Sequence, residues 1–576
     1  MGVKNWKLAG NNLDPLVDAI QRKFALPRPI ALFFAARGIK EEEVQDFLNP
    51  RLANLSDPYR FPGIQDAAKR LWDAIANKET ILIHGDYDTD GITASALLAL
   101  VLRQNGADVH SFIPHRFDDG YGFTPESLQK ALDTFGPASV LVTVDCGITS
   151  CDAVDEAVRR GIDVIVTDHH EAGQQLPNAI AIINPKVYPE LEDLQLLAGA
   201  GAAFKLSHAF IKYGREHNLG GFQTRLEEVL DYVALGTVAD IVPLLGENRI
   251  MVKYGIEALR RQIPPGVRAL IESSKLRSEL TPADITFRMA PRINAAGRVG
   301  DANVALQLLE SEHIVDAYKC ASQLESFNRI RQEKEQEIYQ EACEQIERNL
   351  AWQSDYSLLV AGRDWHQGVI GIVASRIVEV YYRPVLILCS DGESLKGSGR
   401  SVPEFDLHAG LTRCADMLLG FGGHRQAAGL RIAPGRLDEL RERFDAVIRE
   451  ELGEAPLTPS LKIDAEMPFS QASDFTVLKG LELLQPFGIG NPEPIFASLP
   501  LRVKKRKAFG HSREHISLEV TEEGSGITLQ AKAWRQADQI PESIQGQRIR
   551  LAYTPGINAY NGIASVELRV RDWEVL

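Results

Sequence analysis

The chain has 576 residues, which is more than one hydrophobic core can hold, so we expect about three or four domains. Hydrophobic residues make up 44% and charged residues 24%, ordinary values that exclude a disordered or fibrous protein. The N-terminal residues lack the apolar run of a signal peptide, and no stretch is apolar over the thickness of a bilayer. We therefore expect a cytoplasmic protein with no membrane partner.

The cysteines and the net charge limit the kinds of partner. The six cysteines form no CxxC pair and no zinc-knuckle spacing, so we expect reduced side chains that serve mainly in packing. A net charge of −15 argues by itself against a nucleic-acid partner, because binding a polyphosphate depends on Lys and Arg. Residues 456–576, however, contain equal numbers of basic and acidic side chains. The C-terminal region is therefore the relatively basic part.

From about residue 79 to residue 240, short apolar runs alternate with amphipathic stretches. The runs are TILIHG, VHSFIP, SVLVTVDCG and DVIVTDHH, and helical segments separate them, the first starting near Gly91. This order is typical of a doubly wound parallel sheet. We assign the sheet to a domain over residues 56–265, preceded by a small helical extension over residues 1–55.

Two further regions follow. Apolar residues between Asp316 and Asn349 recur at spacings near three and four without Gly or Pro, which predicts a helix roughly 50 Å long. Such a helix suits a strut between two lobes, and we place it in a linker region, 266–350. Residues 351–455 contain YSLLVAG and PVLILCS, which we expect to be strands of a second α/β domain.

Beyond Pro459 the pattern changes to β-structure. HISLEV alternates apolar and polar residues, and Asn561-Gly562 is a hairpin-turn signal, so we expect a small β-barrel over residues 459–576. The run LRVKKRK, residues 501–507, is explained either as a solvated edge strand or as the basic strand of an oligonucleotide-binding fold. Such folds add aromatic platforms for the bases of single strands. The candidates are Lys504, Lys505 and Lys507 for phosphates, and Phe509, Trp534 and Tyr560 for bases.

Acidic and imidazole side chains follow three of the predicted parallel strands. They are Asp86, Asp88 and Asp90 after the first strand, Asp145 after the second, and Asp168, His169 and His170 after the third. Because ligands bind beyond the carboxyl ends of parallel strands, we expect these side chains to converge. Asp240, which follows a predicted helix, is a further carboxylate that could close the site.

A single Asp after a strand most commonly caps the next helix. Three in succession need another explanation, because carboxylates packed closely repel one another unless cations neutralise them. Oxygen ligands with one or two imidazoles and no thiolate suit Mn²⁺ or Mg²⁺, and two such ions suit cleavage of phosphodiesters. The nearby run Gly199-Ala-Gly201 is either close packing at a helix start or a support for this site.

The runs HGDYDTDGITAS, VTVDCG, VTDHH and ALGTVADIVPL resemble, in order and spacing, the four motifs of the DHH phosphoesterase superfamily. The resemblance implies that Asp88 and Asp90 bind separate metal ions and that Asp145 bridges them. It also implies that His169 and Asp240 complete one coordination shell.

The same resemblance implies roles for three neighbouring residues. His170 would be a catalytic acid–base group or a supporting residue behind the ligands. His84 stands where related pyrophosphatases place a metal ligand, so it is a further candidate ligand. Asp86 would either bind metal directly or orient a metal-bound water.

Further motifs resemble RecJ-type exonucleases over nearly the whole chain from about residue 55. They are MAPRINAAGR at 289–298, WHQGVIG at 365–371, GSGR at 397–400 and the DHH-associated motif GGH at 422–424. Glycines let the backbone approach a phosphate, and Arg offers it bidentate hydrogen bonds, although a single Arg is more often an ordinary surface residue. The resemblance implies that the terminal 5′-phosphate is held by Arg116, Arg298, Ser398 and Arg400. Further candidates for DNA contact are Arg292, Asn294, His366, Arg376, Gly423 and His424.

Taken together, the resemblance implies a 5′→3′ exonuclease for single-stranded DNA that uses two Mn²⁺ or Mg²⁺ ions, releases 5′-mononucleotides and serves DNA repair and recombination. Its implied partners are a single-strand-binding protein and a helicase. Two alternatives are a phosphodiesterase for short oligonucleotides, cyclic dinucleotides or pyrophosphate, and a non-catalytic replication scaffold. The C-terminal barrel disfavours the first, and the filled ligand positions disfavour the second.

Chemistry and basic charge are separated along the chain. All the proposed metal ligands precede residue 241, whereas the basic strand and the candidate aromatic platforms follow residue 500. We therefore expect that removal of residues 459–576 leaves cleavage of very short oligonucleotides but weakens binding of long strands.

Overall fold

The computed structural model describes residues 4–9, 14–116, 120, 122–261, 263–276, 280–349, 352–390, 392–453, 457–560 and 563–576. They belong to two compact units, which we describe separately. The parallel-sheet unit comprises Pro50–Arg331 and Pro486–Pro492. The mixed-sheet unit comprises Met1–Asn49, Gln332–Gln485 and Glu493–Leu576. Among the described residues, no helix has the length and apolar character needed to cross a membrane.

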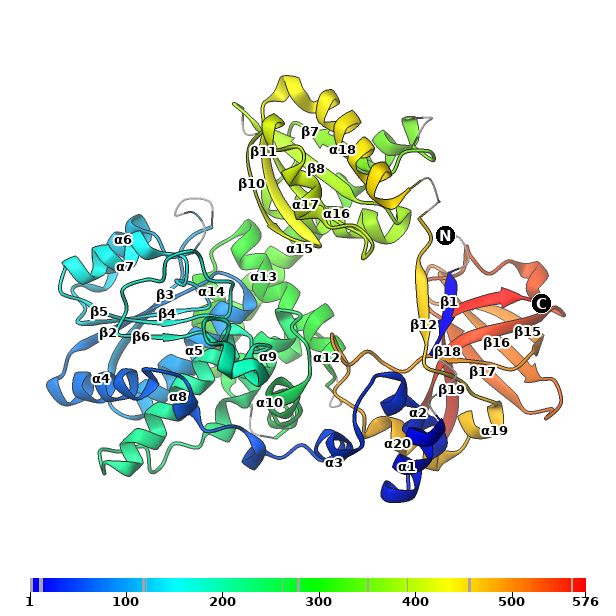
Figure 1. Cartoon of the computed structure of the whole chain (residues 1–576), viewed down its shortest axis with the longest axis horizontal. Coiled ribbons are helices and arrows are strands. Elements are labelled where there is room, and N and C mark those ends of the chain that lie inside the picture. Colours follow the sequence, from blue (N-terminus) through cyan, green and yellow to red (C-terminus); the bar gives the residue numbers. More distant parts are fainter. Residues whose placement is uncertain are drawn as a thin grey trace. The chain divides into compact units, whose positions relative to one another are not determined.

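A parallel sheet forms the centre of the parallel-sheet unit (Figure 1). Its strands are β2 (Thr80–Gly85), β3 (Asp108–Phe112), β4 (Val140–Val144), β5 (Asp163–Thr167) and β6 (Ala181–Ile183). They lie in the order β3-β2-β4-β5-β6, and every pairing is parallel. The chain changes direction along the sheet between β2 and β4, as in doubly wound folds. The predicted doubly wound sheet is confirmed, and β6 is a strand not foreseen from the sequence.

Helices cover both faces of this sheet (Figure 1). Ile81 and Ile83 point into a core shared with α4, α5 and α8, whereas Leu82 between them packs with α6 and α7. The helices are α4 (Ile64–Asn77), α5 (Thr89–Gln104), α6 (Pro125–Phe135), α7 (Cys151–Arg159) and α8 (Gly199–Glu216). With both faces covered, the carboxyl ends of the strands are where a ligand can approach the sheet.

The remaining elements of the parallel-sheet unit are helical. The short 3-10 helices are η2 (Leu52–Asn54), η3 (Pro58–Arg60), η4 (Pro185–Val187), η5 (Pro189–Leu194) and η6 (Leu226–Val229). The other elements are α9 (Leu230–Ala239), α10 (Gly246–Ala258), α11 (Pro265–Ser273), α12 (Pro282–Asp284), the π-helix η7 (Ile285–Met289), α13 (Ala290–Val299) and α14 (Asn303–Glu310). The helix predicted to precede Asp240 is therefore confirmed as α9.

The predicted connecting helix is confirmed as α15 (Ile314–Arg348), which has 35 residues. At a rise of 1.5 Å per residue it is about 50 Å long. The division between the two units falls within it, between Arg331 and Gln332.

A mixed sheet of order β10-β11-β9-β8-β7 follows α15 in the chain. Only β7 and β8 pair in parallel, and both were predicted as strands. The strands are β7 (Leu358–Gly362), β8 (Val385–Ser390), β9 (Leu395–Arg400), β10 (Leu418–His424) and β11 (Ala427–Ile432). The accompanying helices are α16 (Gln367–Tyr381), α17 (Leu407–Thr412), η8 (Ala415–Met417), η9 (Pro434–Arg436) and α18 (Leu437–Leu452).

The predicted C-terminal β-barrel is also confirmed. Strands β15, β16, β17, β19 and β18 pair in sequence, and the pairing of β18 with β15 closes the ring. The elements are β12 (Ser460–Ile463), β13 (Ala465–Glu466), α19 (Phe469–Ala472), α20 (Phe475–Glu482), β14 (Phe496–Ala497), β15 (Leu501–Phe509), β16 (His515–Glu522), β17 (Thr528–Ala533), η10 (Glu542–Ile544), β18 (Arg548–Tyr560) and β19 (Ile563–Val575). Asn561, Gly562 and the side chain of Tyr560 lie outside the described residues.

The N-terminal extension is not purely helical, which corrects the prediction for residues 1–55. It contains β1 (Asn5–Leu8) as well as α1 (Asp14–Phe24), α2 (Arg28–Ala36), η1 (Glu41–Glu43) and α3 (Val44–Leu48). β1 pairs in parallel with β12, and the Arg37 guanidinium forms an ion pair with the Asp464 carboxylate at 3.2 Å. A strand this short gives no periodic signal, and its partner lies more than 400 positions away in the chain.

The six cysteines form no disulfide. Cys146, Cys389 and Cys414 are buried, and the other three are partly buried. The expected packing role for reduced cysteines agrees with these positions.

Candidate metal centre

The parallel sheet brings the predicted acidic residues together at its carboxyl edge. Asp86 follows β2, Asp145 follows β4 and Asp168 follows β5. Asp88 caps α5 by accepting hydrogen bonds from the backbone N–H groups of Asp90 and Gly91. The capping role expected of a single Asp is therefore real for Asp88, but it accounts for only one of the carboxylates.

Three groups of side chains lie close enough to share metal ions. Within each group the candidate ligand atoms lie within 4.8 Å of one another. The groups are Asp86, Asp88 and Asp145; Asp90, His169 and Asp240; and Asp145, His169 and His170. His169 Nε2 lies 3.1 Å from an Asp145 oxygen and 3.6 Å from an Asp240 oxygen. Asp145 and His169 therefore connect the groups into one cluster.

Local backbone features hold these carboxylates in place. Asp145 has φ of +59°, in the left-handed region, and a Cβ at Gly199 would lie 2.5 Å from its Oδ1. The backbone N–H groups of Gly199 and Ala200, at the start of α8, donate hydrogen bonds to Asp90 at 2.6 and 2.9 Å. A helix N-terminus stabilises a nearby anion. The Gly199–Gly201 run thus both packs closely and supports the site.

The cluster carries more negative charge than its surroundings can stabilise. Burial, with repulsion from neighbouring carboxylates, raises the pKa of Asp86 to about 8, of Asp90 to about 7 and of Asp240 to about 8. Burial likewise raises the pKa of Asp145 well above its ordinary value.

Buried atoms in the cluster also point to cations. Asp86 Oδ1, Asp145 Oδ1 and His169 Nε2 are buried without a hydrogen-bond partner. Such atoms are costly unless something else binds them, and a divalent cation would supply both the charge and the contacts. Carboxylate oxygens with an imidazole and no thiolate fit Mn²⁺ or Mg²⁺.

The two histidines have opposite electrostatic environments. Burial and the charge of the neighbouring His170 together lower the pKa of His169 to about 3, while its ring donates a hydrogen bond to the Leu197 backbone. A neutral imidazole oriented in this way fits a metal ligand. His170 is less buried, and although burial lowers its pKa, the hydrogen bond to Asp168 (2.7 Å) raises it to about 9. His170 is therefore a cation at neutral pH.

Asp168 has a structural role that the sequence does not reveal. Its Oδ1 accepts hydrogen bonds from the backbone of His169 and of His170 as well as from the His170 ring. Its other oxygen accepts the N–H of Ile148. Burial raises the pKa of Asp168, but the bonds to His170 and the backbone outweigh it and hold the pKa below its ordinary value. Asp168 thus fixes the position of both histidines.

The geometry does not support His84 as a metal ligand. His84 is fully buried, and its Nε2 lies 2.9 Å from Ser127 Oγ on α6. Its ring contacts Phe112 and Phe123. Side chains alternate along a strand, so His84 points with Leu82 toward the α6 face, whereas Asp86 lies past the end of β2.

The phosphate-binding candidates of the parallel-sheet unit divide into two kinds. Arg292 forms an ion pair with Glu325 at 2.6 Å, and Asn294 accepts hydrogen bonds from the backbone and hydroxyl of Thr89. These two positions stabilise the fold around α13. The Arg116 guanidinium lies over the ring of Tyr87 at 4.9 Å. Arg298 lies in the last turn of α13.

The candidate phosphate and DNA contacts of the mixed-sheet unit also differ in the contacts that they already make. On β9, the Arg400 guanidinium donates to Ser398 Oγ at 3.0 Å, and a Cβ at Gly371 would lie within 3.1 Å of both side chains. His366 accepts the N–H of Gly368 and caps α16. Arg376 lies over the ring of Tyr339 at 3.7 Å. Gly423 and His424 are exposed at the end of β10.

The barrel places basic and aromatic side chains on neighbouring strands. Lys504, Lys505 and Lys507 are exposed on β15. Phe509, His515 and Trp534 form an edge-to-face cluster with ring centroids 4.7 to 5.3 Å apart, and Trp534 is 51% exposed. His515 was not predicted as part of this platform, because only its strand pairing brings it beside the other two rings.

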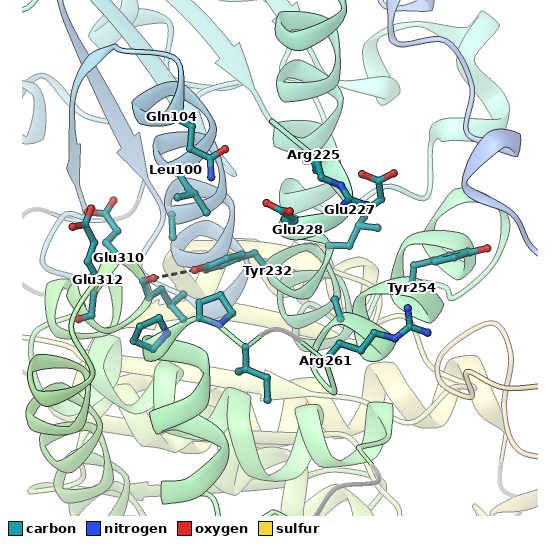
Figure 2. Close-up of a pocket in the computed structure, with 18 of the residues that line it drawn as sticks. Leu100, Gln104, Arg225, Glu227, Glu228, Tyr232, Tyr254, Arg261, Glu310 and Glu312 are labelled. Atoms are coloured by element: carbon teal, nitrogen blue, oxygen red, sulfur yellow. Dashed lines mark hydrogen bonds between the residues drawn. The ribbon is translucent and has the colours of Figure 1, made fainter. Parts of the chain in front are cut away.

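A cavity of about 1110 Å³ lies elsewhere in the parallel-sheet unit (Figure 2). Apolar residues such as Leu100 and Leu230 line it together with Tyr232, whose hydroxyl donates to the Leu309 carbonyl. None of its described lining residues belongs to the carboxylate cluster. This cavity is therefore separate from the candidate metal centre.

Comparison with known proteins relates the whole chain to one family. Three family models match it: the DHH family N-terminal domain over residues 80–237, the DHHA1 domain over 355–450 and the RecJ OB domain over 463–572. The single-stranded-DNA-specific exonuclease RecJ of Dickeya dadantii is 38% identical, covering 95% of this chain and 96% of the relative. That of Escherichia coli is 35% identical, covering 94% and 95%. The chain belongs to the RecJ family of single-stranded-DNA-specific exonucleases.

Solved RecJ structures have the same fold. RecJ from Thermus thermophilus in complex with Mn²⁺ matches with a TM-score of 0.82 and 29% identity, over 99% of this chain and 79% of that one. Its complex with Mg²⁺ matches with a TM-score of 0.77 and 28% identity, over 99% and 78%. The DHH, DHHA1 and oligonucleotide-binding domains of RecJ are therefore present in this chain.

The raised pKa values predict that metal stabilises this protein more at higher pH. The pKa of Asp86, Asp90 and Asp240 is raised by folding, so their stabilising contribution to the metal-free protein is complete below about pH 4 and is lost as pH rises through 7 to 8. Bound Mg²⁺ would replace those protons. The difference in melting temperature between Mg²⁺ and EDTA should therefore widen from about pH 6.5 to about pH 9. A difference that stays constant with pH would contradict the assignment.

Proposed function

We propose that this chain hydrolyses single-stranded DNA from the 5′ end with two Mn²⁺ or Mg²⁺ ions. The observation that carries the proposal is the cluster of three overlapping ligand groups at the carboxyl edge of the sheet. In it Asp88 and Asp90 would hold separate ions, Asp145 would be shared by both, and His169 and Asp240 would complete the ligands of one ion. Asp86 lies beside Asp88 and Asp145, where it either binds metal or orients a bound water.

The chemistry follows from this arrangement. Two divalent ions would activate a water molecule and stabilise the oxygen that leaves phosphorus. Water attack breaks the bond between phosphorus and the 3′-oxygen, so the terminal nucleotide is released as a 5′-mononucleotide. His170, kept protonated by Asp168, can donate a hydrogen bond to a phosphate oxygen or a proton to the leaving oxygen.

We infer the 5′ polarity from the four proposed phosphate contacts, Arg116, Arg298, Ser398 and Arg400. Gly297 packs against the backbone of Tyr87, and Asn294 binds Thr89, so α13 holds Arg298 beside the loop that carries Asp88. On β9, Arg400 and Ser398 form a preformed pair of donors. Arg292, Asn294, His366 and Arg376 are better explained by the contacts they already make, whereas Gly423 and His424 stay candidates for DNA contact.

The barrel supports a long single strand as the substrate. Exposed lysines on β15 would bind phosphates, and Phe509 with Trp534 would stack on bases. A phosphodiesterase for short oligonucleotides or cyclic dinucleotides would have no use for this surface. A non-catalytic scaffold would have no use for a complete set of ligands.

Location, partners and domain limits stay predictions from the sequence. We propose that the enzyme acts in the cytoplasm on DNA under repair or recombination, with a single-strand-binding protein and a helicase as partners. We also keep the five-part division at 1–55, 56–265, 266–350, 351–455 and 459–576. The three matched family models fall inside the second, fourth and fifth of these ranges.

Polarity and the phosphate contacts can be tested in one assay. Single-stranded DNA labelled at one end is digested with Mn²⁺ or Mg²⁺, and a 5′ label should appear at once as mononucleotide, while a 3′ label stays on long products.

The variants Arg298→Ala and Arg400→Ala should slow digestion of 5′-phosphorylated ends about ten- to a hundredfold, which is the effect of losing one charge-assisted hydrogen bond. Digestion of 5′-hydroxyl ends should slow much less. The control is Arg268→Ala, an exposed arginine paired with Glu272. Equal losses on both ends would assign these arginines to structure.

The barrel is tested by reversing the charge of Lys504, Lys505 and Lys507 together. The triple Lys→Glu variant should bind long single strands more weakly, and its plot of log affinity against log salt should be shallower by roughly 0.7 for each phosphate that the lysines no longer neutralise. Cleavage of a trinucleotide should be unchanged. The matched control reverses three exposed lysines elsewhere, Lys40, Lys69 and Lys130. An unchanged salt slope in the barrel variant would place the DNA path elsewhere.

A further inference from the structure

A short segment from the C-terminal region of the chain belongs to the parallel-sheet unit. Pro486–Pro492 packs with that unit, although the chain on both sides of it belongs to the mixed-sheet unit. Its sequence is PFGIGNP. We call this segment the docking turn. Neither the metal ligands nor the proposed DNA contacts include it.

The docking turn is shaped by its own hydrogen bonds. Gly488 and Asn491 exchange backbone hydrogen bonds of 2.9 and 3.2 Å. The Asn491 side chain, which is 1% exposed, donates to the Pro486 carbonyl at 2.8 Å. Gly490 has φ of +73°, a conformation that favours glycine. The turn therefore presents a fixed surface to its neighbours.

That surface packs on the loop that follows the ligand Asp240. The N–H of Leu244 donates to the Ile489 carbonyl at 2.7 Å. A Cβ at Gly490 would lie 2.8 Å from the side chain of Pro243, and a Cβ at Gly488 would lie 2.7 Å from that of Leu244. A side chain at Gly490 would meet the rigid ring of Pro243, and one at Gly488 would require the Leu244 side chain to move, so the turn and the loop fit each other closely.

Helix α10 links the loop that follows Asp240 to the segment that orients His169. The buried Asn248 side chain donates to the carbonyls of Pro243 (3.1 Å) and Leu196 (2.5 Å). Leu197, the next residue along, accepts the hydrogen bond that orients His169. Arg249, 2% exposed, donates to the Pro486 carbonyl of the docking turn at 3.5 Å. One turn of helix thus contacts the docking turn, the loop that follows Asp240 and the segment that orients His169.

Asp240 precedes Pro243 and Leu244, which make these contacts, by only a few residues in the sequence. It ends α9, and Ile241 follows with φ of +63°, which is a strained conformation for a β-branched residue. Such backbone persists only where the surroundings hold it. The contacts at Pro243 and Leu244 supply that restraint.

We propose that the docking turn, with Asn248 and Arg249, positions Asp240 for the metal ion it shares with Asp90 and His169. The proposal rests on the metal centre described above. It also revises the expectation that residues 459–576 can be removed without loss of cleavage, because that deletion takes the docking turn away from the metal centre.

Mn²⁺ binding in the absence of DNA tests this directly. The full-length variants Gly490→Ala and Gly488→Ala are titrated with Mn²⁺, and the free ion is measured by electron paramagnetic resonance. Affinity at one of the two sites should fall about tenfold, the effect typical of groups that orient metal ligands. The turnover number for a short oligonucleotide should fall, with little change in its KM.

Two matched glycines serve as controls. Gly524 has φ of +97°, and nothing lies within 4 Å of a Cβ built on it, so Gly524→Ala introduces a backbone conflict like that of Gly490→Ala away from the docking turn. Gly435→Ala adds a methyl group where nothing lies within 4 Å. Both should bind Mn²⁺ as the parent does. Asp240→Asn is the positive control: unchanged Mn²⁺ binding in that variant would refute the metal assignment itself.

The proposal fails if the Gly490 and Gly488 variants bind both Mn²⁺ ions with parental affinity while Asp240→Asn does not. If either glycine variant does not fold, Asn491→Ser, which shortens the side chain that closes the turn, is judged by the same criterion.

Discussion

Mutual repulsion among buried carboxylates is the constraint around which the active region is built. Asp145 shares one group of candidate ligands with Asp86, and Asp90 shares another with Asp240. Burial raises the pKa of Asp145, and the charges of Asp90, Asp86 and Asp240 raise it further. Nothing in protein folding alone favours such a cluster. The start of α8 offsets part of the charge through two backbone N–H groups, and divalent cations would offset the rest. The site therefore selects its cofactors by charge as well as by geometry.

The acidic cluster and the basic residues proposed to bind DNA lie in different regions of the sequence. A net charge of −15 disfavours DNA binding when averaged over the chain, yet the acidic excess lies outside the barrel region, which carries the basic strand β15. Affinity for a long strand and hydrolysis of its terminal bond can thus reside in different parts of one polypeptide. The docking turn shows that the separation along the sequence is incomplete, because Pro486–Pro492 packs beside the Asp240 loop.

The features that could be predicted from the sequence are those that depend on a local pattern of residues. Apolar runs that end in Asp were enough to predict the parallel sheet, its carboxyl edge and the residues of the cluster. Pairings between remote segments were not predictable, because β1 with β12, or Pro486–Pro492 with Pro243, leave no periodic signal. The motif position of His84 suggested a ligand, but the alternation of side chains along the strand, which the motif does not show, turns it toward Ser127. Asp168 was expected at this edge of the sheet, but its role was not foreseen, because that role depends on the turn that brings the His170 ring back onto it.

The central claim is that Asp145 joins two metal ions in one site. Electron paramagnetic resonance of the Mn²⁺-loaded protein measures both the number of bound ions and whether their spins are coupled. We predict two coupled ions per chain in the parent, and in a folded Asp145→Asn variant loss of the coupling and of at least one ion. A single uncoupled ion in the parent, or a coupled pair that survives the Asp145→Asn change, would contradict the two-metal centre.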